Sequence, residues 1–236
     1  MPRRILVDVD TQADFVDPSG ALYVPAEPGV REAIATALSE AQAAGDPIIG
    51  SVDSHAYDAW EFAANGGPFP PHCVKGTPGW LRVWHDRPAR TRFIPMQTLG
   101  QPLGQTLTDS VTNLVGERRE GAGPRVLDAA ALAAEAREGV GLYFEKEVYS
   151  LFANPVAAPV IARLVESLGG PAEVVFEVIG YCTGGYCVDA AALGLRERGY
   201  RARVLDAATA AIGGADGQAR SRQQLERAGI EWIPAR

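Results

Sequence analysis

The sequence has few of the side chains that serve as nucleophiles or metal ligands. Its 236 residues include three cysteines (73, 182 and 187), three histidines (55, 72 and 85) and two lysines (75 and 146), although arginine is common. Three cysteines do not make a disulfide framework, and an odd count leaves at least one thiol free. Any nucleophilic or metal chemistry must therefore use a short list of residues.

A basic surface and long apolar runs are also missing. Lysine and arginine number 22 against 29 acidic residues, which gives a net charge of -7. Sequence-independent binding of nucleic acid needs a basic patch, so we expect no nucleic-acid partner. The apolar run at the N-terminus contains Asp8 and Asp10, and no stretch of about 18 apolar residues occurs. We therefore expect no membrane partner and a cytoplasmic protein.

Hydrophobic residues make up 47% of the chain, which is typical of a globular protein. Short apolar runs predict strands at 5–9, 47–52, 140–145, 172–179, 202–205 and 230–233. Helical periodicity predicts helices at 28–44, 127–137, 155–168, 187–198 and 217–228. This alternation predicts an α/β fold, a three-layer α/β/α arrangement around a mostly parallel, six-stranded, Rossmann-like sheet.

The segment 81–125 has no clear period, with possible short strands near 91–97 and 104–115. We interpret the chain as a single domain over 1–236 with an insertion at about 81–139.

Three chemically capable side chains lie at predicted strand ends. Asp10 ends the first strand, Lys146 follows the strand at 140–145, and Cys187 follows the strand at 172–179. Ligands of parallel α/β sheets bind at the carboxyl ends of strands. Cys187 also begins a predicted helix, whose free N–H groups and dipole can lower a thiol pKa and bind an oxyanion. By position alone, an inert buried cysteine, a solvated lysine and a turn-capping aspartate remain open.

A second group is suited to a divalent metal ion. Asp53 and His55 follow the second predicted strand, and His72 lies in a loop rich in glycine, proline and aromatic residues. Aspartate and histidine are common ligands of transition metals, and Glu61 could supply a fourth oxygen. Cys73 is the alternative ligand, a soft sulfur donor. His72 could alternatively be a hydrogen-bonded loop residue without a role in metal binding.

Taken together, these segments resemble the nicotinamidase/isochorismatase-like cysteine hydrolases, and within them the nicotinamidases. The matching motifs are D-x-Q-x-D-F at 10–15, D-x-H with F-P-x-H-C-V-x-G-T-x-G at 53–79, F-E-K at 144–146, and G…T…C-V at 180–188. They occur in family order and cover about 1–80 and 140–236. The H-C-V-x-G-T-x-G run is the most specific of them.

The resemblance implies a catalytic triad and a metal site. The triad would be Cys187, Asp10 and Lys146, and the metal ligands Asp53, His55 and His72 with Glu61 as the fourth. The ion would be zinc, with iron or manganese as alternatives. Substrate-binding positions would be Phe15, Phe69, Tyr149 and Thr183. The partner would be a small amide substrate, and we expect a homo-oligomer.

The implied reaction is hydrolysis of nicotinamide to nicotinic acid and ammonia, a step of NAD salvage. The chain departs from the family pattern between Thr183 and Cys187, where the loop is one residue longer and Gly184-Gly185 replaces an acidic or amide residue. A related hydrolase acting on a carbamoyl compound or maleamate is therefore the alternative. A non-catalytic binding module is a further alternative, which the presence of the whole triad disfavours. No G-x-G-x-x-G follows the first strand, which disfavours a dinucleotide-binding oxidoreductase.

Overall fold

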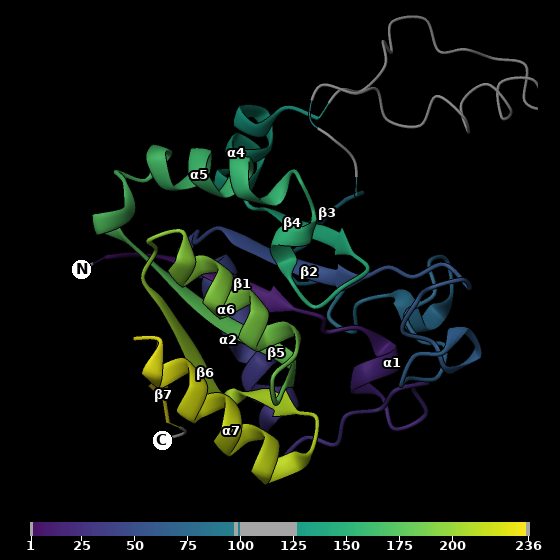
Figure 1. The fold of residues 1–236 in the computed structure, drawn as a ribbon. Coiled ribbons are helices and arrows are strands. Elements are labelled where there is room, and N and C mark those ends of the chain that lie inside the picture. Colours follow the sequence, from purple (N-terminus) through teal and green to yellow (C-terminus); the bar gives the residue numbers. More distant parts are fainter. Residues whose placement is uncertain (1, 97–98, 100–126, 235–236) are drawn as a thin grey trace, which may run out of the picture.

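A parallel β-sheet forms the middle layer of the protein (Figure 1). The computed structural model describes residues 2–96, 99 and 127–234. Within these residues, seven strands run in the order β3-β4-β2-β1-β5-β6-β7, and every neighbouring pair is parallel. Their bounds are β1 Arg3–Val9, β2 Ile48–Asp53, β3 Arg90–Ile94, β4 Val140–Lys146, β5 Val174–Thr183, β6 Ala202–Ala211 and β7 Glu231–Ile233.

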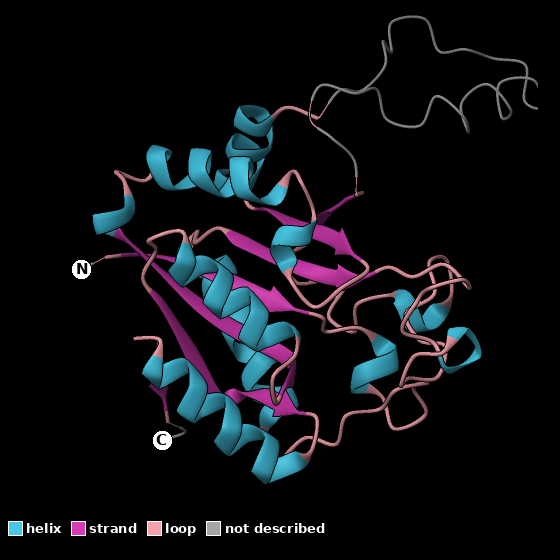
Figure 2. Cartoon of the chain, viewed as in Figure 1, coloured by secondary structure: helices cyan, strands magenta, loops and turns pink. Residues whose placement is uncertain are grey.

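Helices cover both faces of this sheet. Figure 2 shows two of them, α6 and α7, in front of the sheet and α2 behind it. Near β4, α4 and α5 pack against each other. The helices are α1 Ala13–Val16, α2 Val30–Ala44, α4 Ala129–Arg137, α5 Ala157–Ser167, α6 Cys187–Glu197 and α7 Gly214–Arg227. The predicted three-layer α/β/α fold is therefore confirmed, and none of the described helices is long and apolar enough to cross a membrane.

The predicted count of six strands was wrong, because β3 is a seventh. Every residue of β2 and β4 is buried, so their sequences are nearly continuous apolar runs. In contrast, β3 lies at the edge of the sheet, and Ile94 is its one fully buried residue. An edge strand with polar residues such as Arg90 and Arg92 carries a weak apolar signal, which is why the sequence indicated it only as a possibility.

Two described parts of the expected insertion at 81–139 belong to the layers themselves. β3 pairs with β4 in register, and Asp128 caps the N-terminus of α4, where its carboxylate accepts a hydrogen bond from the Ala131 N–H at 2.7 Å. The possible strand at 104–115 lies outside the described residues. The single domain with one insertion remains a prediction.

The four strands at the centre of the sheet end at one edge. β4, β2, β1 and β5 are consecutive neighbours, and the register pairs Asp53 of β2 with Lys146 of β4. Asp10 follows β1 and Cys187 follows β5. The topology alone therefore gathers the predicted catalytic residues.

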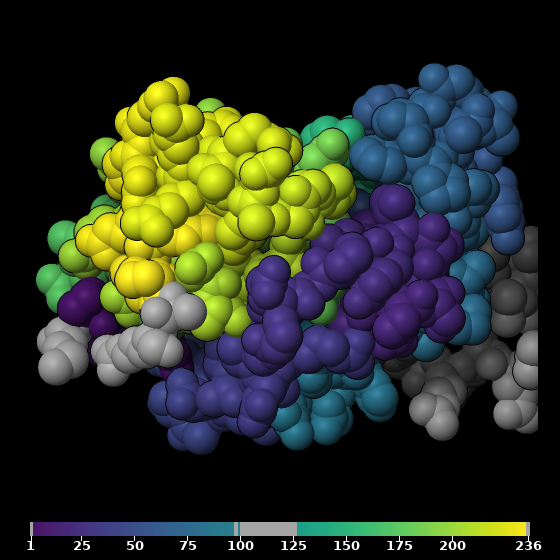
Figure 3. All heavy atoms as spheres, turned by 90° about the horizontal axis from the view of Figure 1, so that it is seen from below, coloured from purple at the N-terminus to yellow at the C-terminus, as the bar shows by residue number. Residues whose placement is uncertain are grey.

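A separate groove lies between the segment 25–30 and α7, where Figure 3 shows the yellow C-terminal surface beside the purple N-terminal one. Its volume is about 610 Å³, and its walls include Pro25, Ala215, Ala219 and Trp232. None of the residues predicted for catalysis or metal binding lines it.

Candidate active site

Lys146 is the centre of a buried group of charged side chains. Its Nζ lies 2.8 Å from Asp10 Oδ2 and 3.5 Å from Cys187 Sγ, and it also donates to Asp53 Oδ1. Lys146 and Asp10 are completely buried. One ammonium thus joins the three residues predicted as a triad to the first of the predicted metal ligands.

The charges of this group are set by burial and by each other. Burial lowers the pKa of Lys146, but Asp10, Asp53 and Cys187 outweigh it and hold that pKa well above its usual value. The pKa of Asp53 falls to about 2, because Lys146 and His55 outweigh the opposing effect of burial. Lys146 is therefore a cation and Asp53 an anion at neutral pH.

Asp10 and Cys187 are the groups between which a proton can move. Burial raises the pKa of Asp10, and Lys146 opposes that rise. Contact with Cys182 and burial raise the pKa of the Cys187 thiol well above its usual value, again opposed by Lys146. Cys187 would thus need a base to act as a nucleophile. One candidate ligand atom each from Asp10, Asp53 and Cys187 lies within 4.8 Å of the others.

Ser51 is a site residue that the sequence did not indicate. Its hydroxyl donates to Asp10 Oδ1 at 2.8 Å, while Oδ2 of the same carboxylate faces Lys146. Asp10 has a positive φ of 51°, which is unusual for a residue other than glycine. Ser51 therefore orients the carboxylate of a strained residue at the end of β1.

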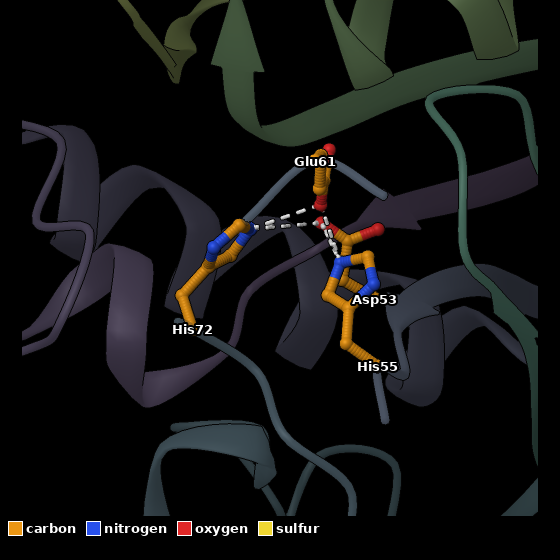
Figure 4. Close-up of side chains that lie close together, drawn as sticks. All are labelled: Asp53, His55, Glu61 and His72. Atoms are coloured by element: carbon orange, nitrogen blue, oxygen red, sulfur yellow. Dashed lines mark ion pairs between the residues drawn. The ribbon is translucent and has the colours of Figure 1, made fainter. Parts of the chain in front are cut away.

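The four predicted metal ligands converge (Figure 4). One ligand atom each from Asp53, His55, Glu61 and His72 lies within 4.8 Å of the others, and all four residues are buried. Nε2 of His55 is 2.6 Å from Glu61 Oε1 and 3.8 Å from Asp53 Oδ2. Nε2 of His72 is 3.4 Å and 3.9 Å from the same two oxygens. Two imidazoles and two carboxylates around one point form a suitable donor set for a divalent transition metal.

Three further observations fit a cation at this point. His72 Nδ1 lies 2.8 Å from the Pro70 carbonyl oxygen, which favours a proton on Nδ1 and leaves the Nε2 lone pair for a ligand bond. Among the described residues, His55 Nε2 has no aligned hydrogen-bond partner despite its short distance to Glu61. Burial lowers the pKa of His55, but Asp53 and Glu61 raise it to about 9, so the pocket attracts positive charge.

Asp53 connects the two halves of the site. Its Oδ1 accepts from Lys146, and its Oδ2 faces both imidazoles. The Asp53 carboxylate would therefore separate a bound ion from the Lys146 ammonium, which contacts the predicted nucleophile Cys187.

The motif at 10–15 has a structural purpose beyond Asp10. The Gln12 amide accepts from the Asp53 N–H at 2.7 Å and donates to the carbonyl oxygens of Asp53 at 2.8 Å and Trp80 at 2.9 Å. Asp14 Oδ2 accepts from the Cys73 N–H at 2.7 Å. These side chains hold the backbone of Asp53 and the backbone next to His72, so the motif positions two predicted metal ligands that lie far along the chain.

Aromatic side chains surround the metal-ligand group. The ring centroids of Phe15 and Phe69 lie 5.5 Å and 5.9 Å from that of His72. The ring centroid of Tyr186 lies 5.3 Å from that of Tyr149 and 6.2 Å from that of Phe69. The structure therefore brings together three of the four predicted substrate-binding residues and adds Tyr186, which the sequence analysis did not single out.

Thr183, the fourth of these residues, has its hydroxyl engaged elsewhere. It donates to Gln218 Oε1 of α7 at 2.7 Å. Its role in substrate binding remains a prediction.

No family model matches the sequence, and no curated protein matches it either. Solved structures with the same fold do match over nearly the whole chain. A pyrazinamidase of Pyrococcus horikoshii in complex with zinc is 22% identical with a TM-score of 0.62, covering 99% of this chain and 100% of its own. A nicotinamidase/pyrazinamidase from Bacillus subtilis is 19% identical with a TM-score of 0.62, covering 98% and 99%.

An N-carbamoylsarcosine amidase from Thermoplasma acidophilum is 19% identical with a TM-score of 0.57, covering 98% and 96%. The chain thus has the fold of these amidases, as the sequence motifs indicated.

Proposed function

We propose that the protein is a metal-containing cysteine amidohydrolase of the nicotinamidase/isochorismatase-like family, which hydrolyses nicotinamide to nicotinic acid and ammonia. The observation that carries this proposal is the contact of Lys146 with Asp10, Asp53 and Cys187 beside a buried group of metal ligands. The fold shared with nicotinamidase and pyrazinamidase structures supports it.

In the first half-reaction, Cys187 Sγ attacks the amide carbonyl carbon and its proton passes to Asp10. Backbone N–H groups at the start of α6 stabilise the oxyanion of the tetrahedral intermediate. The carbon–nitrogen bond then breaks, and ammonia leaves with the proton that Asp10 returns. In the second half-reaction, Asp10 takes a proton from water, and the water oxygen attacks the thioester carbon. The carbon–sulfur bond then breaks, the carboxylic acid is released, and Asp10 returns the proton to Cys187 Sγ.

Lys146 allows this proton to move in both directions between Cys187 and Asp10. Its positive charge lowers the pKa of Asp10 and of Cys187 against the effect of burial, so that both anions can exist in turn. Asp53, His55, Glu61 and His72 would hold the metal ion, a zinc ion by our expectation with iron or manganese as alternatives. When bound, the ion supplies a Lewis acid that orients the substrate ring or a water beside it.

Phe15 and Phe69 lie next to His72 and would enclose a flat heteroaromatic ring together with Tyr149, which packs on Tyr186 beside Phe69. The second candidate substrate is a carbamoyl compound or maleamate. The extra residue in the loop before Cys187 favours this alternative, and an N-carbamoylsarcosine amidase shares the fold.

The test is a panel of small amides with ammonia detection, applied to metal-replete protein. We expect nicotinamide to give the highest kcat/KM, and Cys187→Ala to abolish hydrolysis while metal content stays at the wild-type level. Higher activity on a carbamoyl compound or maleamate would select the alternative. Full activity of Cys187→Ala would refute the mechanism.

A further inference from the structure

The loop before the nucleophile is built on two glycines with left-handed backbone. Gly184 and Gly185 have φ values of 97° and 99°. Such residues have no side chain to hold their conformation, and two in succession leave the backbone free to rearrange. The shape of a loop that ends at Cys187 must therefore be fixed by other residues.

Asp189 and Ser221 hold this loop in place. Ser221 Oγ accepts a hydrogen bond from the Gly184 N–H at 2.5 Å, and Asp189 Oδ2 accepts one from the Gly185 N–H at 2.7 Å. The Ser221 hydroxyl donates to the same Asp189 oxygen at 2.6 Å. Both side chains are buried, with exposures of 1% and 0%. The three bonds connect the loop to the first turn of α6 and to α7.

The same side of α7 carries a second attachment. Gln218 is three residues before Ser221, a spacing that places both on one helix face, and it accepts from the Thr183 hydroxyl. A Cβ at Gly184 would lie 2.5 Å from the Ile212 carbonyl oxygen, so the loop lies directly against the segment that leads into α7. Thr183, Gly184 and Gly185 are thus each held by contacts with α6, α7 or the segment before α7.

These bonds determine which backbone donors remain free. The N–H groups of both glycines are engaged. In the part of the chain that the structure describes, no acceptor receives a hydrogen bond from the N–H groups of Tyr186, the N-cap residue of α6, and Cys187, its first residue. Free N–H groups at a helix N-terminus are suited to an oxyanion.

We infer that Asp189 and Ser221 are positioning residues for catalysis, which hold the Gly184-Gly185 loop so that the N–H groups of Tyr186 and Cys187 face the oxyanion. This inference rests on the proposed function and explains how the longer loop of this chain is held in place. A role of Asp189 in capping α6 would explain its bond to Gly185 but not the bonds through Ser221 to Gly184.

The variants for the test are Ser221→Ala, Asp189→Ala and Asp189→Asn. Ser167→Ala is the matched control, because its hydroxyl bonds only to a carbonyl within α5, that of Leu164, at 2.7 Å. The readouts are kcat and KM for the best amide, the affinity for the corresponding aldehyde, and the affinity for the carboxylate product. The Cys187 thiol adds to the aldehyde carbonyl carbon, and the thiol proton moves to the former carbonyl oxygen. That oxygen then occupies the position of the oxyanion.

Loss of a single oxyanion donor lowers kcat about 10²–10³-fold. Ser221→Ala and Asp189→Ala would displace the N–H donors without removing them, so we expect each to lower kcat about 10–100-fold. Aldehyde affinity should fall in parallel, whereas KM and product affinity should change less than about twofold. Asp189→Asn retains an acceptor oxygen and should recover most of the loss. Ser167→Ala should match the wild type.

The inference is overturned if Asp189→Ala and Ser221→Ala bind the aldehyde as tightly as the wild type, or if product affinity falls equally. A wild type that binds the aldehyde but hydrolyses no amide would refute the proposed function, and the variants' aldehyde affinities would still decide the inference. A wild type that forms no aldehyde adduct would overturn both, since Cys187 would then not be a nucleophile.

Discussion

Replacement of Lys146 by methionine tests the electrostatic centre of the site. Methionine keeps much of the volume of the buried side chain but removes the charge that contacts Asp10, Asp53 and Cys187. The buried carboxylates of Asp10 and Asp53 then lose the ammonium that both contact. The variant should be less stable and much less active, and its stability should depend differently on pH.

The expected loss of stability follows from burial. Removing one partner of a buried ion pair costs about 3–5 kcal/mol, because it leaves an uncompensated charge. Since domains of this kind have about 5–15 kcal/mol of total stability, Lys146→Met should fold but unfold at lower urea concentration. A protonated Asp10 cannot accept the thiol proton, so kcat should fall about 10²–10⁴-fold.

The stability of Lys146→Met should depend on pH, and the burial of Asp10 determines the sign of that dependence. Burial already raises the pKa of Asp10, and removal of Lys146 raises it further above the unfolded value of about 3.9. The folded state then binds more protons than the unfolded state in the window between the two pKa values. Stability that is present below pH 4 is lost as the pH rises through the raised pKa. The deficit against the wild type should therefore grow from pH 5 to pH 8.

The chain's second lysine provides the control. Lys75 Nζ lies 2.6 Å from Glu145 Oε2, but its side chain is 53% exposed, so Lys75→Met should cost less than about 1 kcal/mol at either pH. Urea titrations of the three proteins at pH 5 and pH 8 give the comparison. A Lys146→Met deficit equal to that of Lys75→Met, or one that shrinks as the pH rises, would refute the proposed electrostatics.

Two further substitutions test the metal site. His72→Ala should remove the ion, measured by elemental analysis after dialysis, whereas exposed His85→Ala should retain it; equal metal content in both would contradict the ligand assignment. Gln12→Ala breaks three hydrogen bonds around Asp53, so we expect weaker metal binding and about tenfold lower kcat together, in a protein that still folds. A loss of kcat with metal affinity unchanged would show that Gln12 does not act through Asp53.

Much of the fold could be read from the sequence because burial leaves a periodic signal. β2 and β4 are buried along their whole length, and their apolar runs predicted them. The edge strand β3 was uncertain because three of its five residues are polar and only Ile94 is fully buried. The resemblance also located Asp10, Lys146 and Cys187, because strand ends are positions that an alternating β/α order fixes.

The residues that the sequence did not reveal act through contacts between distant segments. Ser51 is one polar residue in a buried strand, and nothing in its neighbourhood indicates that it orients Asp10. Asp189 and Ser221 lie on different helices, so their joint hold on the Gly184-Gly185 loop exists only after α6 and α7 have packed.

The sequence by itself determined which chemistry was available, since few cysteines, histidines and lysines left few candidates. The tertiary structure decided how these groups act together. Asp53 faces Lys146 with one oxygen and the two imidazoles with the other, and this sharing depends on the register of β2 beside β4. Protonation likewise depends on burial and on charges a few ångströms away, and both are properties of the folded chain.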